Sequence, residues 1–163
     1  MILWLTFGSI FAVWNVFQSP GLDFRLVALG ALLPLTLDAP FGSQAYAHTL
    51  VSAVVVLTVT MATTAGRGHR LRRRRALSLP IGWFIALVLG GSWATKNLFW
   101  WPAFGWSFGH APLPISTRPV LLLAVEEIVG VALLWWAWCR FRLTEPARRG
   151  RFFRTGYLGR DVL

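Results

Sequence analysis

Residues 120–139 read VLLLAVEEIVGVALLWWAWC, an apolar run that ends at Arg140. A helix needs roughly 20 such residues to cross the hydrocarbon core of a bilayer. Four further apolar stretches precede this one, at residues 2–17, 24–37, 47–65 and 79–95. Because backbone groups in lipid must be hydrogen-bonded within their own segment, we expect each stretch to be a helix. The sequence therefore predicts an all-α fold, an integral membrane helical bundle of about five transmembrane helices.

The stretch at 24–37 is shorter than a usual span and contains Pro34. Proline removes a backbone donor and kinks a helix. Two interpretations stay open, a kinked helix that spans and a re-entrant half-helix buried against its neighbours. The first residues, from Met1 to Trp4, carry no basic segment. We therefore interpret the first stretch as a retained membrane segment rather than a cleaved signal peptide.

The composition agrees with a membrane protein and excludes several kinds of site. Hydrophobic residues make up 56% of the chain and charged residues only 13%, whereas a soluble domain carries roughly 25% charged residues. The net charge of +10 does not predict nucleic-acid binding, because the basic residues lie between and after the apolar runs. Cys139 is the only cysteine, so neither an internal disulfide nor a cysteine-based zinc site is available.

The basic residues also predict the orientation in the membrane. Of the 16 Lys and Arg residues, all but Lys96 and Arg118 lie in the connection after the first stretch, in the loop at 66–76 or in the tail after Cys139. The positive-inside rule then predicts a multi-pass protein of the cytoplasmic membrane with a cytoplasmic C-terminus. If the second stretch is re-entrant, the N-terminus changes side and the rest stays in place.

This topology predicts two regions. Residues 1–142 form the transmembrane helical bundle, which includes an aromatic outer loop at 96–118. Residues 143–163 form a basic cytoplasmic tail, which either lies on the inner membrane face or binds a partner.

Four ionisable residues of the apolar stretches and their ends are singled out as candidates: Asp38, His48, Glu126 and Glu127. Charges in lipid are costly, so such residues are candidates for a functional site. The predicted topology places all four toward the outer half of the bundle, and histidine with carboxylates is a ligand set that suits zinc, manganese or iron. The alternative is structural. In that case Asp38 ends a helix, His48 lies at the interface, and one glutamate pairs with Lys96 or Arg118.

Two groups of residues are expected at the membrane interfaces. The outer segment contains Trp93, Trp100, Trp101 and Trp106, and tryptophan favours the headgroup level. We expect these rings to anchor the outer loop, and the alternative is a lid or lipid-binding lip over the bundle. The second group is the run Arg72, Arg73, Arg74 and Arg75. Between two spans this run is expected to orient the protein and to contact anionic headgroups rather than nucleic acid.

Several motifs resemble one known family. They are Gly30-Ala31-Leu32-Leu33-Pro34, Asp38-Ala39-Pro40-Phe41-Gly42, Ala47-His48-Thr49 and Leu98-Phe99-Trp100-Trp101-Pro102. Over about residues 19–158 the chain is similar to the actinobacterial branch of the YdjM-like family of membrane-bound metal-dependent hydrolases. The resemblance implies a metal centre built from a Leu-Leu-Pro-Asp motif, a His-Thr motif and a His-Leu-x-x-Asp motif. In the last motif the His and Asp stand at i and i+4, on one helix face.

The chain departs from that pattern at most ligand positions. Leu35 stands where the first aspartate is expected, and Ala86 and Gly90 replace the His and Asp of the last motif. His48 is retained with Asp38 nearby, whereas a metal centre usually needs three or more protein ligands. Ala86 and Gly90 would instead let two helices pack closely. A divalent metal is therefore expected only if a hydrolase activity survives.

Three functional hypotheses follow. The first is a non-catalytic accessory or structural subunit of a membrane complex, with the bilayer and other membrane subunits as partners. The second is a surviving metal-dependent hydrolase of a phosphoester or lipid, in which Asp38, His48 and Glu126 or Glu127 hold the metal and a carboxylate acts as base. The third is a lipid- or ligand-binding module that uses the outer tryptophans.

Overall fold

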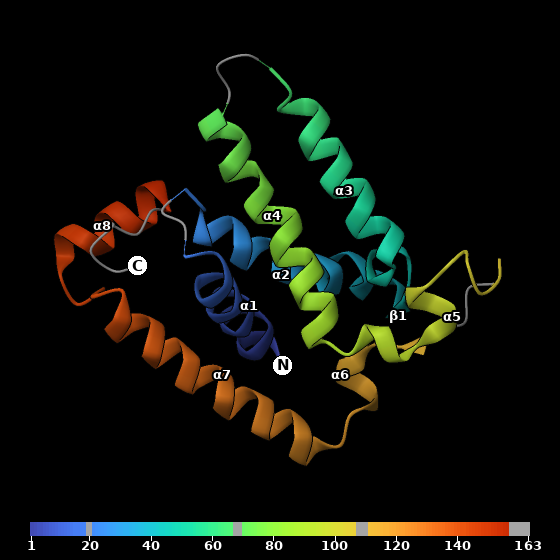
Figure 1. Ribbon diagram of the computed structural model, residues 1–163. Helices are drawn as coiled ribbons and strands as arrows, with labels where there is room; N and C mark the ends of the chain where they lie inside the picture. Colours follow the sequence, from blue (N-terminus) through green and yellow to red (C-terminus); the bar gives the residue numbers. More distant parts are fainter. Residues whose placement is uncertain (19–20, 67–69, 107–110, 157–163) are drawn as a thin grey trace.

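The chain folds into helices joined by mostly short connections (Figure 1). The computed structural model describes residues 1–18, 21–66, 70–106 and 111–156. The longer helices are α1 (Ile2–Phe17), α2 (Phe24–Asp38), α3 (Leu50–Thr63), α4 (Arg70–Leu89), α7 (Val120–Arg140) and α8 (Pro146–Thr155). The connections contain α5 (Lys96–Phe99), α6 (Pro114–Thr117) and the 3-10 turns η1 (Ala39–Phe41), η2 (Tyr46–His48) and η3 (Ser92–Ala94). The all-α class is confirmed.

One short antiparallel pair of strands joins two connections at the same end of the molecule. β1 (Ser43–Gln44) follows α2, and β2 (Ala111–Pro112) precedes α6, with Ser43 opposite Pro112. Gln44 Nε2 also donates to the Pro112 carbonyl at 3.0 Å. The pair thereby ties the connection between α5 and α6 to the loop between α2 and α3.

The long helices of the bundle alternate in direction. α2 and α4 run parallel, because the Asp23 amide at the start of α2 donates to Ser78 Oγ in the first half of α4 at 2.9 Å. α1 is antiparallel to α4, since Trp4 Nε1 near the start of α1 donates to the Leu89 carbonyl at the end of α4 at 3.4 Å.

The two remaining helices follow the direction of α1. The start of α1 contacts Glu127 in the first half of α7, and Trp14 near its end contacts Trp136 near the end of α7, with ring centroids 5.0 Å apart. α3 and α4 form a hairpin (Figure 1). One end of the bundle therefore contains the ends of α1, α3 and α7 and the starts of α2 and α4. The arginine run of α4 lies at this same end.

α2 and α4 cross backbone to backbone. A Cβ built at Gly30 would collide with the Leu79 carbonyl of α4, and one at Gly82 would collide with the Val27 carbonyl of α2. Helices in lipid approach this closely only where side chains are small. Ala86, predicted as a packing residue, is buried beside Ala31 in this interface.

The fourth helix differs from its predicted bounds. It begins at Arg70 instead of residue 79 and ends at Leu89 instead of residue 95. Arginine is a good helix former, so the run Arg72–Arg75 lies in the first turns of α4 and not in a loop. Gly91, with φ +71°, follows the end of the helix, as is common for glycine. Gly90, the second predicted packing residue, therefore lies beyond the helix.

The described part of the basic tail folds back onto the bundle. Phe141 is buried, and Phe152 of α8 packs against the same cluster of apolar side chains as Phe141. Arg25 Nη1 donates to the Phe153 carbonyl at 2.8 Å. α8 is thus attached to the start of α2.

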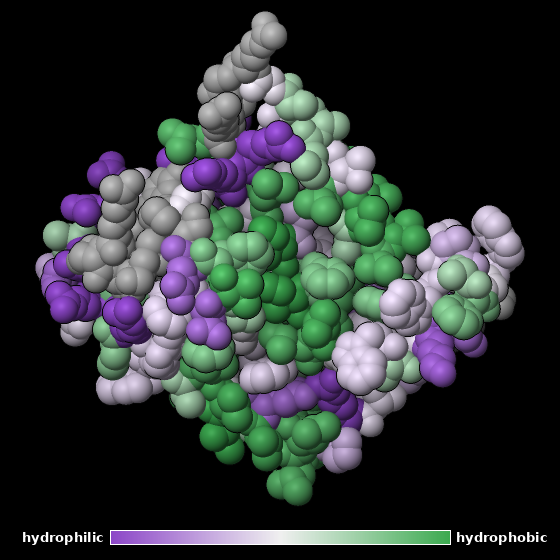
Figure 2. Space-filling model, viewed as in Figure 1, coloured by the Kyte–Doolittle hydropathy of each residue, from purple (hydrophilic) through white to green (hydrophobic). Residues whose placement is uncertain are grey.

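Two helical segments of the described chain are long and apolar enough to cross a membrane. They are Phe24–Phe41, which comprises α2 and η1, and Val120–Arg140, which is α7. α1 and α3 are apolar as well, but their 16 and 14 residues are fewer than the about 20 of a usual span. Figure 2 shows hydrophobic side chains over the middle and at the bottom of the visible face, and hydrophilic ones mainly on its left, near its top and in a patch just above the bottom. Length and composition therefore support two candidate spans. α1 and α4 pack against them, and α3 packs against α4.

Candidate functional site

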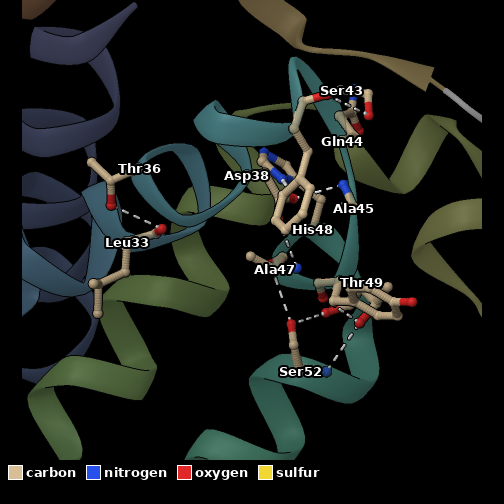
Figure 3. A network of polar contacts seen from close by, with 12 residues as sticks. Leu33, Thr36, Asp38, Ser43, Gln44, Ala45, Ala47, His48, Thr49 and Ser52 are labelled. Carbon is tan, nitrogen blue, oxygen red and sulfur yellow. Dashed lines mark hydrogen bonds and ion pairs between the residues drawn. The ribbon is translucent and has the colours of Figure 1, made fainter.

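Asp38 and His48 come together where α2 passes into α3 (Figure 3). Asp38 ends α2, and the chain returns through η1, β1 and η2 to His48. Asp38 Oδ2 lies 2.6 Å from His48 Nδ1. The two residues are only 2% and 4% exposed, so the pair is shielded from the surroundings.

The Asp38 carboxylate also orders the connecting loop. Its Oδ2 accepts a hydrogen bond from Ala45 N at 2.7 Å, and its Oδ1 accepts one from Ala47 N at 3.3 Å. Buried backbone N–H groups need partners, and the loop follows no regular ladder here. One carboxylate therefore satisfies two backbone donors and one imidazole, and this commits both of its oxygens to the structure.

The same loop fixes the start of α3. Thr49 Oγ1 accepts a hydrogen bond from Ser52 N at 3.1 Å, which is the contact of a helix N-cap. α3 therefore begins at Leu50, three residues later than predicted. The Ala47 carbonyl accepts a hydrogen bond from Trp83 Nε1 at 3.1 Å, and this bond ties the loop to α4.

The pair has the geometry in which a carboxylate orients a histidine. Because Nδ1 of His48 is committed to Asp38, Nε2 is the ring nitrogen left for a metal ion or a proton. One histidine and one aspartate are too few ligands for a metal centre. Within the described ranges, no three His, Cys, Asp or Glu side chains gather in a group that could hold an ion. The residues present do not fit the metal centre that the family resemblance implies.

Glu127 belongs to α7, and its carboxylate lies against the start of α1 and not beside Asp38 and His48. Its carboxylate accepts hydrogen bonds from the Met1 amino group, from Ile2 N at 2.7 Å and from Leu3 N at 3.2 Å. The first N–H groups of a helix have no partner within the helix, and a negative charge favours the positive end of its dipole. Gly130, one turn further along α7, permits the approach, since a Cβ there would lie 2.7 Å from the Leu3 carbonyl carbon.

Glu126 forms an ion pair with Arg118, one of the two partners considered from the sequence. Arg118 Nη2 also donates to the Gly90 carbonyl at 2.6 Å, so the pair joins the start of α7 to the end of α4. The predicted shared site is corrected accordingly, because Asp38 and His48 meet while each glutamate serves a separate contact. Glu126 binds the guanidinium group of Arg118. Glu127 binds backbone amides at the start of α1, which have no partner within that helix.

The residues expected at the membrane interfaces lie on the surface. Trp93, Trp100 and Trp106 are 57%, 43% and 81% exposed. Trp101 contacts Trp106 edge to face, with centroids 6.0 Å apart, while the adjacent Leu98 and Phe99 are buried. The tryptophan-rich segment is thus attached to the bundle by two buried apolar side chains and by the β1–β2 pair, and it presents indole rings on the surface. Their anchoring in headgroups stays a prediction.

Among the described residues, two apolar cavities between the helices stand out. The first has a volume of about 640 Å³ and lies between α1, α3 and α4, and we call it the α3–α4 cavity. Its described lining is entirely apolar and includes Phe17, Val54, Leu57, Pro80, Phe84 and Val88. The second, of about 410 Å³, lies between α1, α2, α7 and α8 with Arg25 in its lining. These linings suit hydrocarbon and offer no arrangement of catalytic groups.

Comparisons with known protein families, with curated proteins and with solved structures found no match. The functional argument therefore rests on the contacts of the described residues.

Proposed function

We propose that this chain is a multi-pass protein of the cytoplasmic membrane that serves as a non-catalytic accessory or structural subunit of a membrane complex. In this proposal α1, α2, α3, α4 and α7 cross the bilayer, and the C-terminus is cytoplasmic. The observation that carries the proposal is the structural use of three carboxylates. Asp38, Glu126 and Glu127 each bond to groups of this chain.

The alternating helix directions support five crossings. α1, α3 and α7 run one way and α2 and α4 the other, as successive spans do. The exposed arginines of α4 and Arg140 at the end of α7 lie at the same end of the bundle. The positive-inside rule assigns that end to the cytoplasm. Arg118, near the opposite end, is held by Glu126.

The carboxylates support a non-catalytic role. Ionisable residues within membrane segments mark functional sites by default, because they are expensive to bury. Here each has a structural explanation. Asp38 orders a loop, Glu127 caps α1, and Glu126 neutralises a cation that bridges two helices. A scaffold of this kind retains its shape without a reacting centre.

The outward face of α7 supports a partner within the membrane. Of the residues in its span, 11% are buried within the fold, against 33% for the span of α2. Ile128 and Trp135 are 68% and 70% exposed. α7 packs against α1 along one side, and a helix with so few buried residues has a broad apolar surface left for other membrane helices.

Site-specific photocrosslinking in native membranes tests the accessory role. A photoreactive residue replaces Ile128 on α7 in one variant and Leu29 on α2, which is 56% exposed, in the control. We expect a discrete protein adduct at Ile128 and lipid adducts alone at Leu29. Lipid adducts alone at Ile128, together with a monomer in mild detergent, would contradict the accessory role.

A metal-dependent hydrolase, the alternative that the family resemblance implies, would have to be built on Asp38 and His48 alone, because the described residues offer no group of three ligands. The contact of 2.6 Å between Asp38 and His48 is the type of contact that orients a histidine ligand. Elemental analysis of the protein purified without chelators tests this candidate. Stoichiometric zinc, manganese or iron that is lost in His48→Ala would support it, and a metal-free preparation that gains no activity with added metal would remove it.

A further inference from the structure

The start of α4 carries positive charge that the described part of the chain does not neutralise. Arg72, Arg73 and Arg74 are exposed. No described carboxylate pairs with these three, because the described acidic residues are engaged with Arg25, His48, Arg118, the Met1 amino group and Arg148. Like charges close together on a helix repel, and the start of a helix disfavours cations. An anion from outside the chain would relieve both effects.

Two of these arginines share helix faces with the lining of the α3–α4 cavity. Residues seven and eleven positions apart lie on one face of an α-helix. Arg73 therefore shares a face of α4 with Pro80 and Phe84, and Arg74 shares a face with two further lining residues, Ile81 and Ile85. Both arginines lie nearer to the start of the helix than these lining residues. Figure 2 shows hydrophilic side chains at the start of α4 next to a hydrophobic surface along α3 and α4.

The dimensions match one leaflet of a bilayer. From Pro80 to Leu89 the lining of α4 extends over about 13 Å at the usual helical rise, and half of the hydrocarbon core measures about 15 Å. Arg73 lies about 10 Å from Pro80 along the helix, on the side of the helix start. An apolar cavity thus follows a cationic cluster in the direction of the membrane interior.

We propose that this site binds one anionic phospholipid of the inner leaflet, with its phosphate on Arg73 and Arg74 and an acyl chain in the α3–α4 cavity. Guanidinium groups form paired, charge-assisted hydrogen bonds with phosphate. The wholly apolar lining accommodates the hydrocarbon chain without leaving a polar group unpaired. The proposal rests on the membrane location proposed above, and it needs neither the accessory role nor the outer tryptophans.

The test uses the full chain in nanodiscs of phosphatidylcholine that contain a minor fraction of phosphatidylglycerol. Native mass spectrometry after mild detergent release counts the retained lipid. We expect one phosphatidylglycerol per chain. The variant Arg73→Gln/Arg74→Gln should bind it about 25-fold more weakly, at about fivefold per arginine. The control Arg149→Gln/Arg154→Gln on α8 removes the same charge and should bind within about twofold of the parent.

A second pair of variants tests the acyl chain without changing charge. Val54→Trp fills the cavity from α3 and should weaken retention, whereas Val59→Trp, at an exposed position outside the lining, should not. Equal retention of phosphatidylcholine, an equal loss in the α8 control, or unchanged binding by Val54→Trp would overturn the lipid site. Failure of the parent chain to enter nanodiscs at all would instead contradict the membrane location.

Discussion

Replacing Asp38 tests whether its carboxylate has a structural or a catalytic role. In Asp38→Asn the amide oxygen takes the place of Oδ2 and keeps the contacts to Ala45 N and His48, at 2.7 and 2.6 Å. The amide nitrogen then faces Ala47 N, whose bond to Oδ1 was the longest of the three at 3.3 Å. Asp38→Ala loses all three contacts and leaves two backbone donors unsatisfied, the buried Ala47 N and the partly buried Ala45 N.

The magnitudes follow from those contacts. An unsatisfied buried donor costs about 1–3 kcal/mol, so we expect Asp38→Asn to lower the free energy of unfolding by about 1–2 kcal/mol and Asp38→Ala by about 3–6 kcal/mol. For a chain of this size about 1 kcal/mol corresponds to roughly 2–4 °C in melting temperature. The asparagine variant should melt roughly 2–8 °C lower, and the alanine variant about three times as far below the parent.

Thermal unfolding in mild detergent, followed by far-ultraviolet circular dichroism, gives the measurement. Thr36→Ala on the same helix is the control, because its exposed hydroxyl bonds only within α2, to the Leu33 carbonyl at 3.1 Å, and it should melt with the parent. If Asp38→Ala also melts with the parent, the carboxylate does not order the loop and the structural interpretation is refuted.

Three further predictions concern the packing and the glutamates. Gly82→Ala should lower the free energy of unfolding by about 1–3 kcal/mol, because the new Cβ forces α2 and α4 apart. The control Gly150→Ala has nothing within 4 Å of the new Cβ and should be neutral or stabilising. Equal melting temperatures of the two variants would refute the close crossing. Arg118→Met should lower the free energy of unfolding by about 3–5 kcal/mol, because it leaves the Glu126 carboxylate unpaired. The double variant Arg118→Met/Glu126→Met should regain most of that stability. A further loss of stability in the double variant would contradict the pairing. Glu127→Ala should speed amide hydrogen exchange at the start of α1 more than Glu127→Gln, which keeps an acceptor, and identical exchange would speak against the cap.

Hydropathy predicted the helices that are apolar along their whole length. α1 has the predicted bounds, and α7 extends only one residue further. α4 was displaced because hydropathy reports where a segment can lie in a membrane and not where a helix begins. Its first turns are arginines, which are polar but favour helix, and no sequence signal separated them from a loop.

The candidate site was only partly visible in the sequence. The short connection between α2 and α3 was enough to bring Asp38 and His48 together. The partners of Glu127 are backbone amides 125 and 124 residues away, and backbone groups leave no mark in sequence composition. Gly30 and Gly82 went unnoticed as well, since nothing local distinguishes two packing glycines among the 15 in the chain.

Cysteine labelling in intact cells tests the membrane topology most directly. In a Cys139→Ser background, single cysteines replace Phe104 in the outer segment and Ala65 between α3 and α4, and a maleimide that cannot cross membranes is added. The five-span bundle with its arginines inside predicts that Phe104→Cys is labelled at once and Ala65→Cys only after permeabilisation. Labelling of Ala65→Cys in intact cells would contradict it.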